Sequence, residues 1–235
     1  MDFNDPFDCS PTVSLSAPQK VYEDYLGDLF REKVKGLSRR DRRAMLSDIR
    51  HDPARRPGSA ELRASMRSAV SNMVNSAGVL SLAARPDQVL LWSHYASAHT
   101  GICLRFSRAP WAYPFRAAQK VIYSEQRPVL NPVLDNADAQ VDKAILTKAD
   151  FWAYEEEWRV LSHPGGVVPG GPGLVTFDPK ALDAIILGAR VSDADVAEVA
   201  SWVEGREQPV ALLRAHPNAE RFRIDIVPLD AAVKG

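Results

Sequence analysis

The sequence contains only two cysteines, Cys9 and Cys103, which are too few for the disulfide framework of a small secreted protein. It has no cluster of cysteine and histidine at zinc-binding spacing. It also lacks a run of about 18 apolar residues that could cross a membrane, and its acidic first residues lack the apolar stretch of a signal peptide. These absences predict a soluble cytoplasmic protein that does not bind a membrane.

The charge of the chain is nearly balanced overall but unevenly distributed. The 235 residues have a formal net charge of −1, so no global attraction to nucleic acid is expected. Residues 31–67 nevertheless contain twelve Lys/Arg against five Asp/Glu, a local excess of +7 that leaves −8 for the rest of the chain. Such a stretch is usually the solvated side of helices. The alternative is a docking face for an acidic or phosphate-bearing partner.

Hydrophobic periodicity predicts a single α+β domain over residues 1–235, with a helical section at 18–76 and a sheet-rich section at 78–235. Ser38 and Ser59 are predicted to cap the second and third of three helices in the helical section. Many short strands joined by hairpin-length loops favour a mainly antiparallel twisted sheet. Neither a G-x-G-x-x-G nor a Walker motif is present, which argues against a doubly wound nucleotide-binding fold. Beyond residue 78, we predict strands at 79–82, 101–106, 120–123, 156–162, 174–177, 184–188, 210–215 and 221–227, and longer helices at 135–152 and 192–204.

Residues 154–159 place three glutamates beside an arginine. If this segment is a strand, alternation puts Glu155, Glu157 and Arg159 on one face and leaves Trp158 for the core. Neighbouring carboxylates held by an arginine suit a group that accepts a hydrogen bond from a hydroxyl or stabilises developing positive charge. The alternative is a charged strand on a solvated sheet face.

A second cluster brings an indole, a hydroxyl, an imidazole and a phenol together in Trp92, Ser93, His94 and Tyr95. Aromatic side chains with polar ends often line ligand pockets, so these four are predicted to bind a substrate or cofactor. We expect Glu155 and Glu157 to project into the same hollow. Ser93 and His94 are sequence neighbours, which rarely form a nucleophile and base, so no serine hydrolase is predicted. His94 is equally well explained as a hydrogen-bonded structural residue.

The N-terminal segment Phe3-Asn4-Asp5-Pro6-Phe7-Asp8 predicts a firm turn, because Asn and Asp oxygens before a proline accept hydrogen bonds from backbone N–H groups. Such a turn is either purely structural or holds a loop beside a cleft. In the second case, Asn4 and Asp5 are binding residues.

These segments together resemble a bacterial family known as domain of unknown function 2971. The resemblance covers nearly the whole chain, and its segments occur in the family in the same order. Because the family is largely uncharacterised, it implies little chemistry. Members begin with a strand and a helix that precede the Asn-Asp-Pro-Phe segment, whereas this chain starts almost at that segment. The matching segments are residues 3–8, Leu91-Trp92-Ser93-His94-Tyr95, Gly101-Ile102-Cys103-Leu104, Trp152-x-Tyr154-Glu155-Glu156-Glu157-Trp158-Arg159 and Ile185-Ile186-Leu187-Gly188.

The layout of that family is in turn similar to the ADP-ribosyltransferase fold, in which a late strand carries a catalytic glutamate. The similarity implies an NAD-using enzyme or a degenerate relative, in a toxin or phage-defence setting. An early strand anchors NAD in that fold and has no counterpart here, so weak NAD binding or none is expected. By this similarity Glu157 is the catalytic carboxylate, Glu155 orients the acceptor and Arg159 fixes the carboxylate. The binding residues that it implies, with the turn included, are Trp92, Ser93, His94, Tyr95, Tyr154, Arg159, Asn4 and Asp5.

Two other functions fit the same residues. In a non-catalytic binding or regulatory module, the aromatic residues belong to the core and the basic helices at 31–67 contact a partner. In a nuclease or hydrolase, Glu155, Glu157 and Asp5 hold a divalent metal, although three carboxylates at this spacing are not diagnostic.

Overall fold

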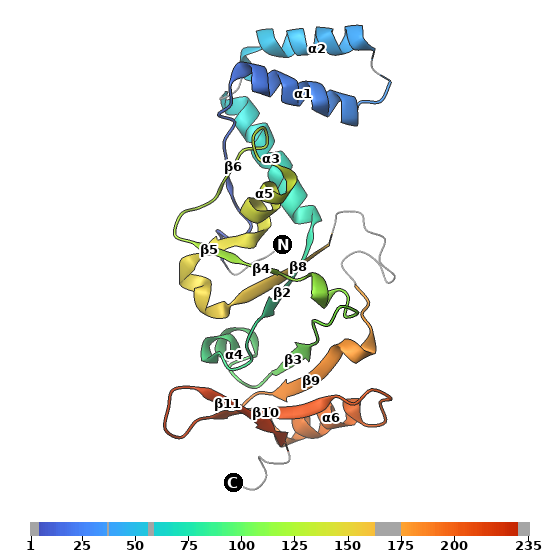
Figure 1. Cartoon of the computed structure of the whole chain (residues 1–235). Helices are drawn as coiled ribbons and strands as arrows, with labels where there is room; N and C mark the ends of the chain where they lie inside the picture. The colour runs from blue at the N-terminus through green and yellow to red at the C-terminus, as the bar shows by residue number, and fades with distance from the viewer. Residues whose placement is uncertain (1–4, 37, 56–58, 163–174, 230–235) are drawn as a thin grey trace. The chain divides into compact units, whose positions relative to one another are not determined.

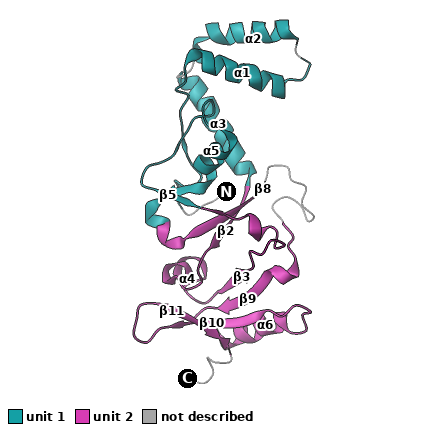
Figure 2. Ribbon diagram, viewed as in Figure 1, with its two compact units in different colours: residues 1–77, 121–152 teal, residues 78–120, 153–235 magenta. Residues whose placement is uncertain are grey.

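The computed structural model describes residues 5–36, 38–55, 59–162 and 175–229, so Asn4 lies outside the described residues (Figure 1). The chain divides into two compact units (Figure 2). Unit 1 comprises Met1–Ala77 and Val121–Trp152, and unit 2 comprises Gly78–Lys120 and Ala153–Gly235. The predicted change from helices to sheet at residue 78 coincides with a unit boundary. Residues 121–152 belong to the helix-containing unit, and the single domain stays a prediction.

The first three helices of unit 1 begin where the sequence predicts. They are α1 (Gln19–Lys33), α2 (Arg39–His51) and α3 (Ala60–Ser76). The Ser38 hydroxyl accepts a hydrogen bond from the Asp41 backbone N–H, and the Asp41 carboxylate accepts one from the Ser38 N–H, which completes the predicted capping box. Ser59 caps α3 in the same way through the N–H of Leu62. These local bonds satisfy backbone donors that have no partner inside the helix.

The rest of unit 1 departs from the predicted helix at 135–152. The α-helix α5 (Ala137–Val141) continues only through one π-helical stretch, η3 (Asp142–Leu146), before the chain becomes strand β7 (Thr147–Ala149). β7 pairs in parallel with β5 (Ile122–Ser124), so strand pairing between distant residues overrides the local helical preference. The remaining elements of this region are β1 (Thr12–Val13), which pairs in parallel with β6 (Val129–Leu130), and the 3-10 segments η1 (Pro53–Arg55) and η4 (Asp150–Glu155).

Unit 2 contains two sheets. One has the strand order β2-β8-β4 and is antiparallel throughout. The other has the order β11-β10-β9-β3, in which only β9 and β10 run parallel. Residues 175–177, predicted as part of a strand, are not in one. The strands are β2 (Gly78–Ala83), β3 (Ile102–Phe106), β4 (Gln119–Lys120), β8 (Glu157–Ser162), β9 (Leu182–Leu187), β10 (Ala211–Pro217) and β11 (Ile224–Pro228), and the helical segments are α4 (Val89–Tyr95), α6 (Asp193–Val203), η2 (Phe115–Ala117) and η5 (Pro179–Ala181).

The core of unit 2 forms on both faces of β9. Ile186 packs in a buried cluster with Trp92 and Ala96, at the end of α4. Ile185 belongs to a second buried cluster that contains Val199 of α6. Because helices cover both faces, β9 is apolar along nearly its whole length, as buried strands are. The α+β fold class with a mainly antiparallel sheet is therefore confirmed, with the strands divided among separate sheets.

None of the helices in the described ranges is long and apolar enough to cross a membrane.

Candidate functional site

Two of the three consecutive glutamates are buried where η4 ends and β8 begins. Glu155 ends η4 and Glu157 begins β8, and each residue is only 4% exposed. Glu156 lies between them with a φ of 46°, the left-handed region that non-glycine residues seldom occupy, and its side chain is 41% exposed. Strain of this kind costs about 1–3 kcal/mol and gathers at functional sites. The backbone turn at Glu156 thus keeps the carboxylates on either side of it inside unit 2.

The predicted alternation of this segment is only partly correct. Glu155 precedes the strand, so simple alternation does not set its direction. The face that carries Glu157 and Arg159 is buried rather than solvated, because Arg159 is 0% exposed. Trp158, expected in the core, is only partly buried, with the Arg108 guanidinium 4.1 Å from its ring. The alternative of a charged strand on a solvated face is therefore wrong.

Glu157 and Arg159 form a two-bond ion pair. Arg159 Nε donates to Glu157 Oε1 at 2.8 Å, and Arg159 Nη2 donates to Glu157 Oε2 at 3.1 Å. Residues two apart on a strand lie on the same face, which brings the two side chains together. Paired donors of this kind fix both the charge and the orientation of a carboxylate. Glu157 therefore has both of its oxygens engaged by Arg159.

Glu155 accepts a hydrogen bond from a different element. Tyr95 is the last residue of α4, and its hydroxyl donates to Glu155 Oε1 at 2.9 Å. Tyr95 is 57% exposed, whereas Glu155 is buried. One side of the pair is therefore at the surface. A ligand hydroxyl can replace the tyrosine hydroxyl there without leaving the buried carboxylate unpaired.

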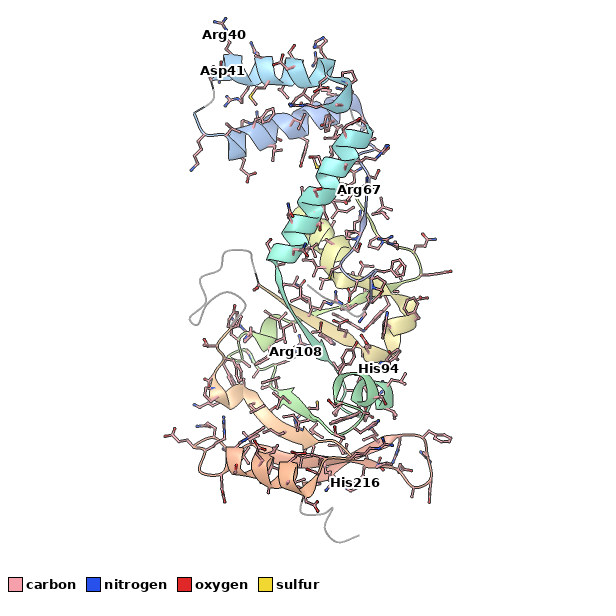
Figure 3. The ribbon with its side chains drawn as sticks, turned by 180° about the vertical axis from the view of Figure 1, so that it is seen from behind. Arg40, Asp41, Arg67, His94, Arg108 and His216 are labelled. Carbon is pink, nitrogen blue, oxygen red and sulfur yellow. The ribbon has the colours of Figure 1, made fainter. Side chains whose placement is uncertain are left out.

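The other residues predicted at 92–95 lie in different surroundings. Trp92 is 3% exposed in the core, where its indole N–H donates to the Pro86 carbonyl at 2.6 Å. Ser93 Oγ lies 3.1 Å from Nε2 of His99. His94 is exposed at the surface of α4, with its ring edge-on to Tyr95 at 6.1 Å between centroids (Figure 3). Tyr95 donates a hydrogen bond to one of the buried carboxylates. Trp92 is a core residue rather than a pocket residue.

His99 was not predicted as a site residue. Its ring stacks on Trp92 at 6.5 Å, and it ends a run with positive φ in Ser97, Ala98 and His99. Ser93, whose hydroxyl lies beside the His99 ring, also donates to the Val89 carbonyl at 3.1 Å, which is an ordinary hydrogen bond on a helix surface. Residue type gave little sign of this turn, since serine and alanine do not favour the left-handed region that Ser97 and Ala98 occupy.

Unit 1 contains a separate buried cluster around the N-terminal turn. Asp5 is 5% exposed, accepts a hydrogen bond from Trp152 Nε1 at 2.9 Å and accepts another from the Phe7 backbone N–H at 2.9 Å. Asp8 lies 3.9 Å from Lys148 Nζ, and both side chains are nearly inaccessible. The bond from Phe7 to Asp5 is the predicted side-chain cap of the turn. Asp8 and Lys148 were missed as a pair because 140 residues separate them in the sequence.

The comparisons with known proteins identify the central part of the chain. Residues 91–160 match the model of a family described as "Protein of unknown function (DUF2971)". This segment resembles the DUF2971 family. The resemblance expected from the sequence is therefore confirmed over these residues. Searches of curated proteins and of solved structures found no match to the chain.

The DUF2971 segment contains Tyr95, Glu155, Glu157 and Arg159, which we call the carboxylate cluster. Tyr154, also predicted as a binding residue, is partly buried in η4 within the same segment. Asp5 and the basic residues at 31–67 lie outside it. The family match thus concerns the residues of the carboxylate cluster and does not extend to the helices α1 to α3.

The charges beside the DUF2971 carboxylates are already paired. Arg85 donates to both oxygens of Asp87, at 3.0 and 2.7 Å, and lies 3.6 Å from Glu156. The hydrogen bonds from Arg85 lower the pKa of Asp87.

Over the described ranges, no group of three His, Cys, Asp or Glu side chains is placed to hold a metal ion. The metal-dependent alternative therefore has no ligand set among these residues.

Proposed function

We propose that the carboxylate cluster is a glycosyl-transfer site of ADP-ribosyltransferase type, with NAD as substrate and Glu155 as the carboxylate that contacts it. The observation that carries the proposal is the 2.9 Å bond from the half-exposed Tyr95 hydroxyl to the buried Glu155 carboxylate. In the ligand complex, a ribose hydroxyl takes the place of the tyrosine hydroxyl. The toxin or phage-defence setting stays a prediction.

The proposed chemistry needs a carboxylate near the ribose. When the bond between C1′ and the nicotinamide nitrogen breaks, its electron pair leaves with nicotinamide and positive charge develops on the ribose. A carboxylate that accepts a hydrogen bond from the 2′-hydroxyl stabilises this charge more than it stabilises the ground state. A nucleophile then bonds to C1′ and releases its proton to solvent.

The geometry favours Glu155 over Glu157 for this contact. Both oxygens of Glu157 are bound by Arg159, so using them for a ligand would break a buried two-bond ion pair. Glu155 instead accepts its hydrogen bond from Tyr95, whose side chain is exposed at the surface. In this proposal Glu157 and Arg159 are positioning residues, which hold the start of β8 and so the direction of Glu155.

Replacing Glu155 by glutamine tests the proposal. Nicotinamide release from NAD by the full chain, measured by chromatography, is expected to fall about a hundred-fold or more, the effect of removing one preorganised electrostatic group. Glutamine still accepts a hydrogen bond from Tyr95, so the variant should remain folded. NAD should still raise its thermal midpoint, because the glutamate acts mainly in the transition state.

Glu156→Gln is the matched control, since Glu156 is the next residue and its side chain is 41% exposed. It should release nicotinamide at the wild-type rate. If the wild-type chain neither releases nicotinamide nor gains thermal stability with NAD, the proposal fails. Equal losses in the two variants would also contradict it.

A second candidate function is the docking of an acidic or phosphate-bearing partner on α2. No residue of α2, all of which the structure describes, is buried. Arg39 and Arg43 are one helical turn apart, and Arg40 is three residues from Arg43, so the three lie on one side of the helix. No ion pair within the described ranges engages them, in contrast to Arg50, which binds Glu23 at 2.9 Å. A basic surface of this kind attracts polyanions.

Replacing Arg39, Arg40 and Arg43 together by glutamine should weaken binding of a fluorescent RNA oligonucleotide at least ten-fold at low salt. Each lost phosphate contact lowers the electrostatic part of binding and its dependence on salt. Polarisation measured against salt concentration gives both quantities. The control replaces the exposed Arg190, Arg206 and Arg221 of unit 2 and changes the net charge equally. Similar losses in both triple variants would show that only net charge matters, and would contradict a docking face on α2.

A further inference from the structure

Unit 1 contains a cavity of about 320 Å³ between the N-terminal segment and α3. This volume is at the small end of the range for ligand pockets, and it equals the liquid volume of about ten water molecules. The side chains from α3 recur at intervals of three and four residues, so they form one face of the helix. The α3 residues that line the cavity are Arg67, Val70, Ser71, Val74 and Asn75, and the facing residues are Asp8, Cys9, Ser10, Pro11 and Val13.

The lining combines buried apolar side chains with exposed polar ones. Val74 and Cys9 are buried, at 5% and 8% exposure, and Val70 is partly buried. Ser71 and Asn75 are exposed one turn apart, and the Asn75 amide lies 3.4 Å from the Ser71 hydroxyl. The cavity can therefore surround a short apolar body and offer hydrogen bonds to a polar end.

The charges around the cavity favour an anion. Arg67 is exposed on α3 (Figure 3), and no hydrogen bond or ion pair within the described ranges engages its guanidinium. Arg127 adds a second guanidinium next to the wall, since its Nη2 donates to the Ser10 carbonyl at 2.5 Å. The one acidic residue of the lining, Asp8, is almost inaccessible and lies 3.9 Å from Lys148 Nζ, which offsets its charge. The accessible charge at the cavity is thus positive.

We propose that this cavity binds a small organic anion, in which a carboxylate or phosphate group contacts Arg67 and a short apolar body lies among Val13, Val70 and Val74. The planar guanidinium matches the geometry of both kinds of head group. This site is distinct from the carboxylate cluster, since every residue that lines it belongs to unit 1.

The test follows the valine methyl resonances of the full chain by NMR while hexanoate is added. Methyl signals of Val13, Val70 and Val74 should shift and saturate. Acetate, which lacks the apolar body, and 1-hexanol, which lacks the charge, should each bind at least ten-fold more weakly. Hexyl phosphate in place of hexanoate tells which head group the site prefers.

Arg67→Gln should weaken hexanoate binding about ten-fold or more, the loss expected for a charge-assisted hydrogen bond. Because Arg67 is exposed, this variant should fold normally. Arg190→Gln is the matched control, an exposed arginine of unit 2 that does not line the cavity, and it should bind as the wild type does. The absence of methyl shifts up to the solubility limit of hexanoate would overturn the proposal, as would equal affinity in Arg67→Gln. Neither outcome bears on nicotinamide release, which tests unit 2.

Discussion

Replacing Arg159 by methionine is expected to lower the free energy of unfolding by about 3–5 kcal/mol, because it removes the guanidinium that binds both oxygens of the buried Glu157 carboxylate. Arg159 is 0% exposed, Glu157 is 4% exposed, and two hydrogen bonds at 2.8 and 3.1 Å join them. The cost comes from the charge that remains, since a buried ionised carboxylate has lost its water and in the variant also loses the two hydrogen bonds from Arg159. Urea unfolding followed by circular dichroism measures the change.

Two comparisons show whether the burial of charge is the cause. Arg105→Met makes the same substitution at an exposed position of β3 in the same unit, and should change stability by less than about 0.5 kcal/mol. Replacing Glu157 by leucine together with Arg159 by methionine removes both charges, and should recover most of the loss. If the double variant is as unstable as Arg159→Met alone, packing rather than charge accounts for the effect.

Gly188→Ala is expected to destabilise the protein by about 2–3 kcal/mol, at the high end for overpacking. A Cβ at Gly188 would lie 2.1 Å from the His99 carbonyl oxygen and 2.8 Å from the Gly101 carbonyl oxygen. Both are backbone atoms, and each is held by a hydrogen bond, from the Arg190 N–H at 3.0 Å and from the Gly188 N–H at 2.9 Å. The loop therefore cannot make room by turning a side chain. Thermal and urea unfolding of the variant measure the effect.

Gly27→Ala is the control for the effect of glycine replacement itself. Gly27 lies inside α1, and a Cβ there would meet no atom within 4 Å. Alanine is favoured over glycine inside a helix by about 1 kcal/mol, so this variant should be slightly more stable than the wild type. A Gly188→Ala variant with wild-type stability would mean that the loop carrying His99 is not fixed against β9.

Features that depend on neighbouring residues were predictable from the sequence. The starts of α2 and α3 follow from Ser38 and Ser59, because a cap needs only a backbone donor three positions away. The turn at Asp5 is of the same kind. The α+β class followed from many short periodic segments, which do not require the strand pairing to be known.

Features that depend on distant residues were not predictable. The helix expected at 135–152 gave way to β7 because β5, more than twenty residues earlier, pairs with it. The sequence shows that Glu157 and Arg159 share a face, but whether that face is buried depends on what packs against it. The bond from Tyr95 to Glu155 joins residues 60 apart. The left-handed backbone conformation of Glu156 cannot be predicted from the residue type, since glutamate does not favour that conformation.

The division of unit 1 into two separate stretches has a consequence for shortened forms of this protein. Removing the first 77 residues would delete α1, α2 and α3 but leave residues 121–152, which would lose the β1 partner of β6. No single cut in the gene separates the two units cleanly. A shortened form that keeps only unit 2, with Tyr95 and Glu155, therefore requires excision of 121–152 as well, with a linker joining residue 120 to residue 153 (Figure 2).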